Sequence, residues 1–286
     1  MSEALAPGLA LDPRTATRGP HVETVDADRA RRYADATNDP NPLYLDGTFA
    51  PPGFAVVPTW EPLIGLGQEL VPPEYWLRLV HSAQDIVYHR PLVPGIELTT
   101  TARVHNVRSS RMGTNACLRG TALDADGLPV LDLYMTSFVR GLGPLENWGP
   151  DQPEHGFPRE TRNAKLGTEV LRVDEDQSYR YADASGDHLP IHVDPEVARG
   201  AGFPGVILHG LCTLAFCSRV VLDLAGQSGP SALRRLAVRF TRPVIPGSEL
   251  VVSVFEGTPT DDRRILHFEA VSRGRVVAKE GLAELN

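Results

Sequence analysis

An internal repeat is the feature of this sequence that most limits how the chain can fold. Three segments of the first half recur in the second half in the same order, and in the first pair Tyr, Ala, Asp, Ala, Asp, Pro and Asp are identical. Matched segments in a fixed order indicate two copies of one structural unit. The matched pairs are residues 33–46 with 181–194, 53–58 with 205–210, and 90–98 with 242–250.

The length of the chain and a Gly- and Pro-rich stretch near its middle agree with two domains. A chain of 286 residues is long for one domain and comfortable for two. A stretch rich in Gly and Pro from residue 141, followed by a polar stretch, separates the two copies. The sequence therefore predicts a first domain over residues 1–140, a linker over 141–167 and a second domain over 168–286.

Each copy has the same predicted order of loop, apolar helix and strands. Residues 206–225 are apolar on nearly every side, as is typical of a helix buried all round. Residues 56–70 are the weaker counterpart, because Pro58 and Pro62 interrupt them. A helix is also expected over residues 28–35 with Asp28 as its cap, after a loosely held lead-in of residues 1–20. The predicted strands are residues 97–108, 114–124, 128–140, 249–257, 265–272 and 275–285.

No helical pattern separates these strands within either half. Neighbouring strands joined by short turns have to pair antiparallel, and Asp126-Gly127 and Arg273-Gly274 are hairpin signals. The simplest architecture is an α+β fold, in which an antiparallel sheet wraps around one central helix. This unit is made twice, and the two sheets join edge to edge.

The stretch with the most evident chemistry is SGDHLPIHVDP, residues 185–195. It places Asp187 and His192 five residues apart, and Gly186 and Pro190 predict a tight loop rather than a regular helix. Such a loop can direct both side chains into one pocket. Gly210 follows near the start of the apolar helix and offers a backbone N–H. A carboxylate, an imidazole and an oriented amide together suit proton transfer beside a carbonyl group.

These motifs resemble the signature of the MaoC-like (R)-specific enoyl-CoA hydratases, the hydratase-2 group. SGDHLPIHVDP is followed by Gly-Phe and then by VILHG, as in that family. The resemblance spans both halves and implies a double hotdog fold. It also implies a hydro-lyase that hydrates trans-2-enoyl thioesters or dehydrates (3R)-hydroxyacyl thioesters, carried on CoA or acyl-carrier protein, in fatty acid or polyketide metabolism.

The resemblance assigns roles to individual residues. Asp187 and His192 hold the catalytic water, and the N–H of Gly210 binds the thioester oxygen. One of the two side chains acts as base and the other delivers a proton, and the sequence leaves open which does which. Leu189 stands where the family has an Asn that fixes the loop. Ser218, Leu189 and Tyr181 are possible pocket residues.

The first half lacks two of the groups that this chemistry needs. Asp39 keeps the carboxylate, but Tyr44 stands where the second half has His192. Pro58 stands where the second half has Gly210, and proline has no N–H to donate. The sequence therefore predicts that residues 1–140 form a catalytically degenerate domain.

Composition excludes some partners. The formal net charge of −8 argues against broad nucleic-acid or anionic-membrane binding, and no apolar run reaches membrane-spanning length. Cys117, Cys212 and Cys217 lack metal-ligand spacing and suit a reducing compartment. The N-terminus shows no signal-peptide pattern. We therefore expect a cytoplasmic protein without a metal or cofactor, either a monomer or a homodimer.

Two other functions remain open at this stage. A hotdog thioesterase is a second enzymatic hypothesis, although the loop motif favours addition of water to an alkene. A non-catalytic acyl-thioester-binding or partner subunit is the alternative from another class, and the departure at Leu189 keeps it open. The sequence does not identify the acyl chain, the carrier or the direction of the reaction.

Overall fold

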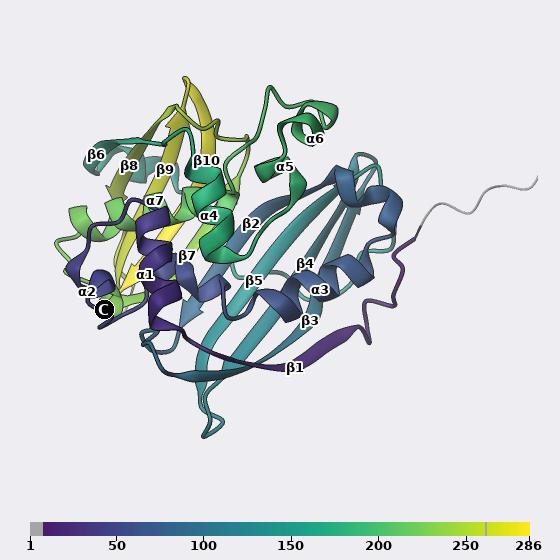
Figure 1. Ribbon diagram of the computed structural model, residues 1–286, viewed down its shortest axis with the longest axis horizontal. Coiled ribbons are helices and arrows are strands. Elements are labelled where there is room, and N and C mark those ends of the chain that lie inside the picture. The colour runs from purple at the N-terminus through teal and green to yellow at the C-terminus, as the bar shows by residue number, and fades with distance from the viewer. Residues whose placement is uncertain (1–7, 261) are drawn as a thin grey trace, which may run out of the picture.

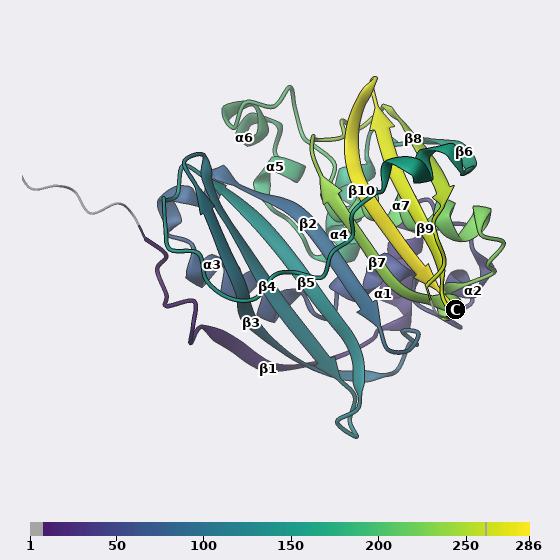
Figure 2. The same cartoon turned by 180° about the vertical axis from the view of Figure 1, so that it is seen from behind.

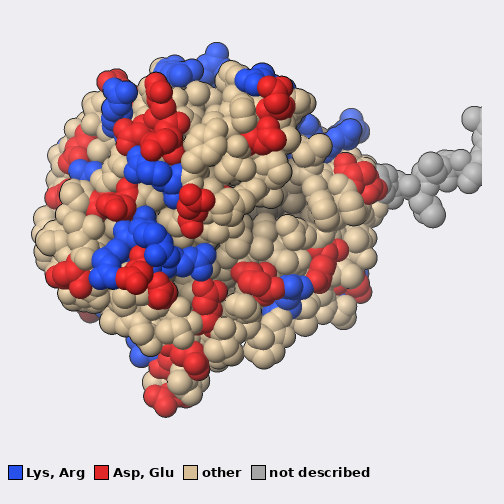
Figure 3. Space-filling view, in the orientation of Figure 1, with Lys and Arg blue, Asp and Glu red and all other residues tan. Residues whose placement is uncertain are grey.

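A ten-stranded antiparallel sheet carries the helices on one of its faces (Figure 1). The computed structural model describes residues 8–260 and 262–286. The strand order is β1-β3-β4-β5-β2-β7-β10-β9-β8-β6, so the strands of each half stay together. Among the described helices, none is long and apolar enough to cross a membrane. On the face that carries the helices, basic side chains alternate with acidic ones (Figure 3).

The first half supplies five strands and the first three α-helices. Short 3-10 helices also occupy Pro52–Val56 and Pro73–Arg78. The elements are β1 (Thr17–Thr24), α1 (Ala27–Ala36), α2 (Pro42–Leu45), α3 (Trp60–Leu70), β2 (Leu79–Tyr88), β3 (Glu97–Ser110), β4 (Gly113–Leu123) and β5 (Pro129–Arg140).

The second half repeats this plan with a longer central helix. Further 3-10 helices occupy Arg159–Asn163 and Pro230–Ala232. The elements are β6 (Lys165–Arg172), α4 (Gln177–Ser185), α5 (Pro190–Val193), α6 (Pro195–Gly200), α7 (Gly210–Leu224), β7 (Leu233–Phe240), β8 (Glu249–Glu256), β9 (Arg264–Ser272) and β10 (Arg275–Leu285).

The two half-sheets join through β2 and β7, which confirms the predicted edge-to-edge architecture. The pairing runs from Ala83 opposite Arg239 to Val87 opposite Arg235. Arg235 crosses the junction and bonds Asp85 at 2.7 Å, while its other nitrogen reaches Glu284 at 3.1 Å. The junction is therefore held by main-chain hydrogen bonds and by ion pairs that water screens only weakly.

The helix α7 is buried on most of its surface, as its apolar sequence predicts. It begins at Gly210 rather than at residue 206. The N–H of Ile207 donates to the carbonyl of Ile191, and the N–H of Leu208 donates to the carbonyl of Val244. The backbone before Gly210 therefore bonds neighbouring segments and does not belong to the helix. In the first half, α3 begins only at Trp60, because a 3-10 helix precedes it.

Several local predictions were wrong. Asp26, and not Asp28, caps α1 by accepting from the N–H of Arg29. The strand β1 begins within the expected lead-in of residues 1–20, and residues 1–7 lie outside the described part. Pro190 starts the short helix α5 instead of preventing one, because a proline at the first helical position gives up no hydrogen bond. The sequence pattern did not reveal four strands, namely β1, β2, β6 and β7.

The segment between the halves crosses the face of the sheet that carries no helices (Figure 2). Trp148 forms a backbone bridge with Val107 of β3. Further along, the ring of Phe157 stacks on His267 of β9, with 5.1 Å between the ring centroids. The segment thus packs against strands of both halves, and β6 begins at Lys165, inside the predicted linker.

Candidate functional site

Asp187, His192 and His209 meet between the end of α4 and the start of α7. One carboxylate or imidazole atom of each lies within 4.8 Å of the others. Asp187 and His192 are 8% and 7% exposed, and His209 is fully enclosed. The loop therefore brings together the two side chains that the sequence predicted would converge, and adds a second imidazole.

The loop owes its shape to a glycine and to an arginine from the other half. Gly186 adopts φ +86°, a conformation that other residues rarely adopt, and it ends α4. Arg29 of α1 donates to the carbonyls of Ala184 at 3.1 Å and Ser185 at 2.7 Å. The first half thus holds the segment that leads into Asp187.

A backbone carbonyl orients the His192 ring. The Nδ1 atom lies 2.7 Å from the carbonyl oxygen of Ile207. A carbonyl can only accept, so Nδ1 carries the proton when the ring is neutral. Nε2 is then the acceptor nitrogen, which is the form that a general base requires.

His209 contacts both His192 and the backbone of Asp187. Its ring stacks on His192 with 3.8 Å between centroids, and its Nε2 donates to the backbone carbonyl of Asp187 at 2.9 Å. Tyr181 packs against the same ring at 4.7 Å. These contacts could not be predicted from the sequence, because His209 and its contact partners lie in different segments of the chain.

Burial shifts the protonation of all three groups toward their neutral forms. Desolvation raises the pKa of Asp187, although the nearby His192 opposes the shift. Desolvation also lowers the pKa of His192, against the attraction of Asp187. The pKa of His209 lies well below the ordinary value, because of burial and then of His192. The site therefore favours a neutral imidazole beside a carboxyl group that holds its proton more tightly than usual.

Gly210 is the first residue of α7, immediately after His209. The first N–H groups of a helix have no partner within it and point out of the positive end of the helix dipole. A Cβ on Gly210 would lie 3.2 Å from the ring of Phe240, which is tighter than ordinary contact. A side chain at position 210 would therefore require the Phe240 ring to shift by a few tenths of an ångström.

The three possible pocket residues lie in different surroundings. The hydroxyl of Ser218 donates within α7 to Ala215 at 2.8 Å. The hydroxyl of Tyr181 lies 3.4 Å from that of Tyr33 in the first half. Leu189 is 37% exposed, and its N–H donates to the carboxylate of Asp187 at 3.3 Å.

The first-half counterpart of this site is built differently. Asp39 is buried and its pKa is raised by desolvation, but Tyr44 supplies no imidazole. The Tyr44 hydroxyl has no hydrogen-bond partner among the described residues. Asn41 caps α2 by accepting from Leu43 at 3.0 Å, whereas Leu189 at the equivalent position of α5 offers no side-chain cap.

The cluster has the donor types of a metal site. Imidazole and carboxylate are common ligands of zinc and iron, and the sequence missed the grouping because His209 comes from a separate segment. Two imidazole nitrogens already bond backbone carbonyls. His192 Nε2, His209 Nδ1 and the Asp187 carboxylate are the atoms left to bind a ligand.

Both halves match models of known families. Residues 153–273 match the MaoC-like domain, and residues 15–133 match the FAS1-like dehydratase domain region. The chain is 32% identical over 217 residues to 3-hydroxyacyl-thioester dehydratase Y of Mycobacterium tuberculosis, covering 72% of each. It is 29% identical over 187 residues to a probable enoyl-CoA hydratase 2 of Dictyostelium discoideum, covering 64% of this chain and 63% of that one.

The fold has a solved counterpart as well. A MaoC-like dehydratase of Phytophthora capsici superposes with a TM-score of 0.81 at 24% identity, over 95% of this chain and 96% of that one. This likeness covers both halves and the joined sheet. With two half-sheets, each beside its own central helix, this chain is a double hotdog protein of the MaoC-like dehydratase family.

Proposed function

We propose that the protein hydrates trans-2-enoyl thioesters to (3R)-hydroxyacyl thioesters, or catalyses the reverse dehydration. The observation that carries this proposal is the meeting of the oriented His192 ring with Asp187 beside the start of α7. The relatives that bear the names enoyl-CoA hydratase 2 and 3-hydroxyacyl-thioester dehydratase support it. The carrier is CoA or an acyl-carrier protein.

With Nε2 of His192 free to accept a proton, His192 acts as the base and Asp187 as the acid. In hydration, His192 Nε2 takes a proton from water as the water oxygen bonds C3 of the alkene. The π electrons shift toward C2, and negative charge grows on the thioester oxygen, which the N–H of Gly210 stabilises. Asp187, whose pKa is raised, gives its proton to C2. The proton on His192 then returns to Asp187, and the reverse sequence expels water.

A direct assay separates this proposal from its competitors. Adding protein to an enoyl thioester should remove the absorbance of the conjugated double bond without releasing free thiol. Release of thiol at an unchanged double bond would identify a thioesterase. Tight binding of the thioester with neither change would identify a non-catalytic binding subunit.

Asp39→Asn should leave hydration nearly intact, with kcat/KM within about twofold of the parent. Asp39 has no imidazole partner, and the equivalent helix position is Pro58, so this loop lacks a base and an oxyanion donor. The measurement is the rate of absorbance loss, beside the matched Asp187→Asn variant. Equal damage from both substitutions would contradict the proposed degenerate role of the first half.

We infer that His209 positions the catalytic pair. His209→Phe keeps a stacked ring but removes the bond to the Asp187 carbonyl, and should lower kcat about tenfold. His209→Asn also opens the face of His192 to water. Because burial holds the pKa of His192 down, the acid limb of the pH–rate profile should move to higher pH in the Asn variant. If the acid limb of the pH–rate profile stays at the parent's pH in both variants, His209 serves only to pack against its neighbours.

The monomer or homodimer expected from the sequence stays a prediction, as does a cytoplasmic location. The three cysteines are free and buried, which suits a reducing compartment.

A further inference from the structure

The helices α1 and α4 occupy equivalent places in the two halves, and they pack against each other (Figure 1). Tyr33 of α1 and Tyr181 of α4 are matched residues of the repeat, and their rings meet edge to face with 5.3 Å between centroids. Arg29 lies four residues before Tyr33, and Gln177 lies four residues before Tyr181. Arg29 and Gln177 are therefore equivalent residues, one in each helix.

Each of these two side chains reaches the carboxyl end of the other helix. The side-chain amide of Gln177 donates to the carbonyl of Ala36, the last residue of α1. Arg29 donates to the carbonyl of Ala184 at 3.1 Å, and Ala184 is the match of Ala36 in the repeat. The last carbonyls of a helix have no partner within it, so a donor from outside stabilises that end. The two halves thus cap each other's helix reciprocally.

The end of α4 depends on Arg29 more than the end of α1 depends on Gln177. Among the residues that the structure describes, Arg29 is the one side chain of the first half that hydrogen-bonds the last two residues of α4, and it also donates to Ser185 at 2.7 Å. Its positive charge suits the negative end of a helix dipole, and Glu23 pairs with it at 3.0 Å. The end of α1 receives a second donor, because Arg180 bonds the carbonyl of Asp35 at 3.0 Å.

The segment that Arg29 holds leads directly into the catalytic loop. Arg29 bonds the carbonyl of Ser185, and the hydroxyl of Ser185 accepts from the N–H of Asp187 at 3.2 Å. A displacement of Ser185 would therefore move Asp187 relative to His192. Misplacing a reacting group by about 1 Å can cost about a hundredfold in rate.

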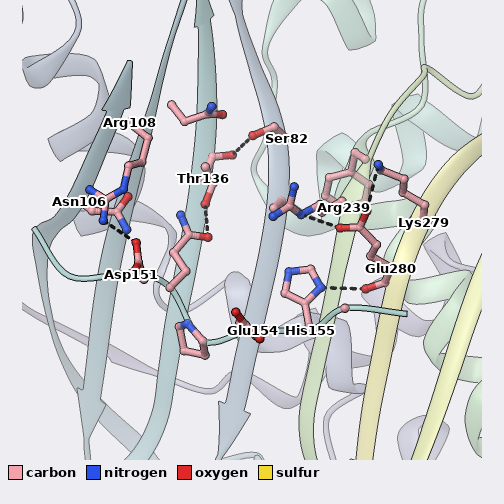
Figure 4. Close-up of a pocket in the computed structure, with 16 residues that line it drawn as sticks. Ser82, Asn106, Arg108, Thr136, Asp151, Glu154, His155, Arg239, Lys279 and Glu280 are labelled. Atoms are coloured by element: carbon pink, nitrogen blue, oxygen red, sulfur yellow. Dashed lines mark hydrogen bonds and ion pairs between the residues drawn. The ribbon is translucent and has the colours of Figure 1, made fainter. Parts of the chain in front are cut away.

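Other contacts hold the two halves together. On the face without helices, the segment between the halves bonds each of them (Figure 4). Arg108 of β3 pairs with Asp151 at 2.7 Å, and His155 donates to the carbonyl of Glu280 in β10 at 2.8 Å. The strands β2 and β7 also pair directly. Substitution of Arg29 should therefore leave the fold in place and act on the loop.

We propose that Arg29 is a positioning residue for the catalytic loop, supplied by the half that lacks the catalytic groups. It holds Ala184 and Ser185 in place, and so keeps Asp187 close to His192. The inference rests on the proposed hydratase activity and gives the first half a part in it.

Arg29→Met tests this role, because it removes both bonds and keeps an unbranched side chain. The kcat for hydration of an enoyl thioester should fall about tenfold to a hundredfold, with KM within about twofold of the parent. The matched control is Gln177→Met, which removes the equivalent bond to Ala36. Because Gln177 is fully buried, this change should lower Tm at least as far, while kcat stays within about twofold. Arg29→Lys keeps the charge and one donor group, so its kcat should lie between those of Arg29→Met and the parent.

A parent-like kcat in Arg29→Met and Arg29→Lys would overturn the proposal, as would equal losses of kcat in Arg29→Met and Gln177→Met. Amide hydrogen exchange over residues 185–192 provides a second measurement that needs no activity. Exchange there should be faster in Arg29→Met and unchanged in Gln177→Met, and unchanged exchange in both would also overturn the proposal. Failure of the hydratase proposal is distinguishable, since the unaltered protein would then hydrate no enoyl thioester.

Discussion

His192→Gln should lower kcat for hydration by about 10²- to 10⁴-fold, the usual contribution of a general base. Glutamine keeps a side-chain N–H that can reach the carbonyl of Ile207, but it has no nitrogen that accepts a proton. The loop should therefore hold its shape while the water loses its base. The absorbance of the enoyl thioester measures the rate, and thermal unfolding checks that the fold persists.

The matched control for this substitution is Tyr44→Phe, at the equivalent position of the first half. Tyr44 is buried, and its hydroxyl bonds no described residue, so its loss should leave the rate unchanged. A His192→Gln variant that retains most of the parent kcat would show that another group deprotonates the water.

Asp187→Asn should abolish hydration to a similar degree and at the same time stabilise the protein at neutral pH. The amide can still accept from the N–H of Leu189 but has no acidic proton to give to C2. Removing a carboxylate that is buried and costly to ionise favours the folded state. The measurements are the hydration rate and the free energy of unfolding by denaturant, each as a function of pH.

The pH dependence of this stability gain follows from the direction of the pKa shift. Burial raises the pKa of Asp187 above its ordinary value of 3.8, so the folded state binds the proton more tightly than the unfolded state. Below the ordinary value, both states are protonated and the Asn variant gains nothing. As pH rises toward the folded pKa, the parent loses up to about 1.4 kcal/mol per pH unit relative to the variant, and above it the difference is constant. A variant that is less stable than the parent at neutral pH would show that the carboxylate is stabilised by its neighbours.

Much of the architecture could be predicted because the same order of sequence motifs occurs in both halves of the chain. The six predicted strands match β3, β4, β5, β8, β9 and β10 closely, since each alternates or adjoins a hairpin signal. The four missed strands lack such signals. In β2 the burial pattern is continuous rather than alternating, and β1 and β6 are edge strands with mostly exposed side chains. Their pairing depends on distant partners and not on local pattern.

The site was predictable where its residues share one segment. Asp187 and His192 lie in a single loop whose spacing brings them together. The stacking of His209, the anchoring carbonyl of Ile207 and the bonds from Arg29 were not predictable, because each joins segments that are distant in sequence. The approach of Phe240 to Gly210 likewise arises only from the packing of α7 against β7.

The joining of both half-sheets in one chain has an evolutionary consequence. In a symmetric pair of identical chains, any substitution in the gene alters both loops, so a tyrosine in place of the histidine would remove both imidazoles. Here Tyr44 and His192 mutate independently, as do Pro58 and Gly210. Fusion thus allows the loop that carries Asp39 and Tyr44 to change without altering the loop that carries Asp187 and His192.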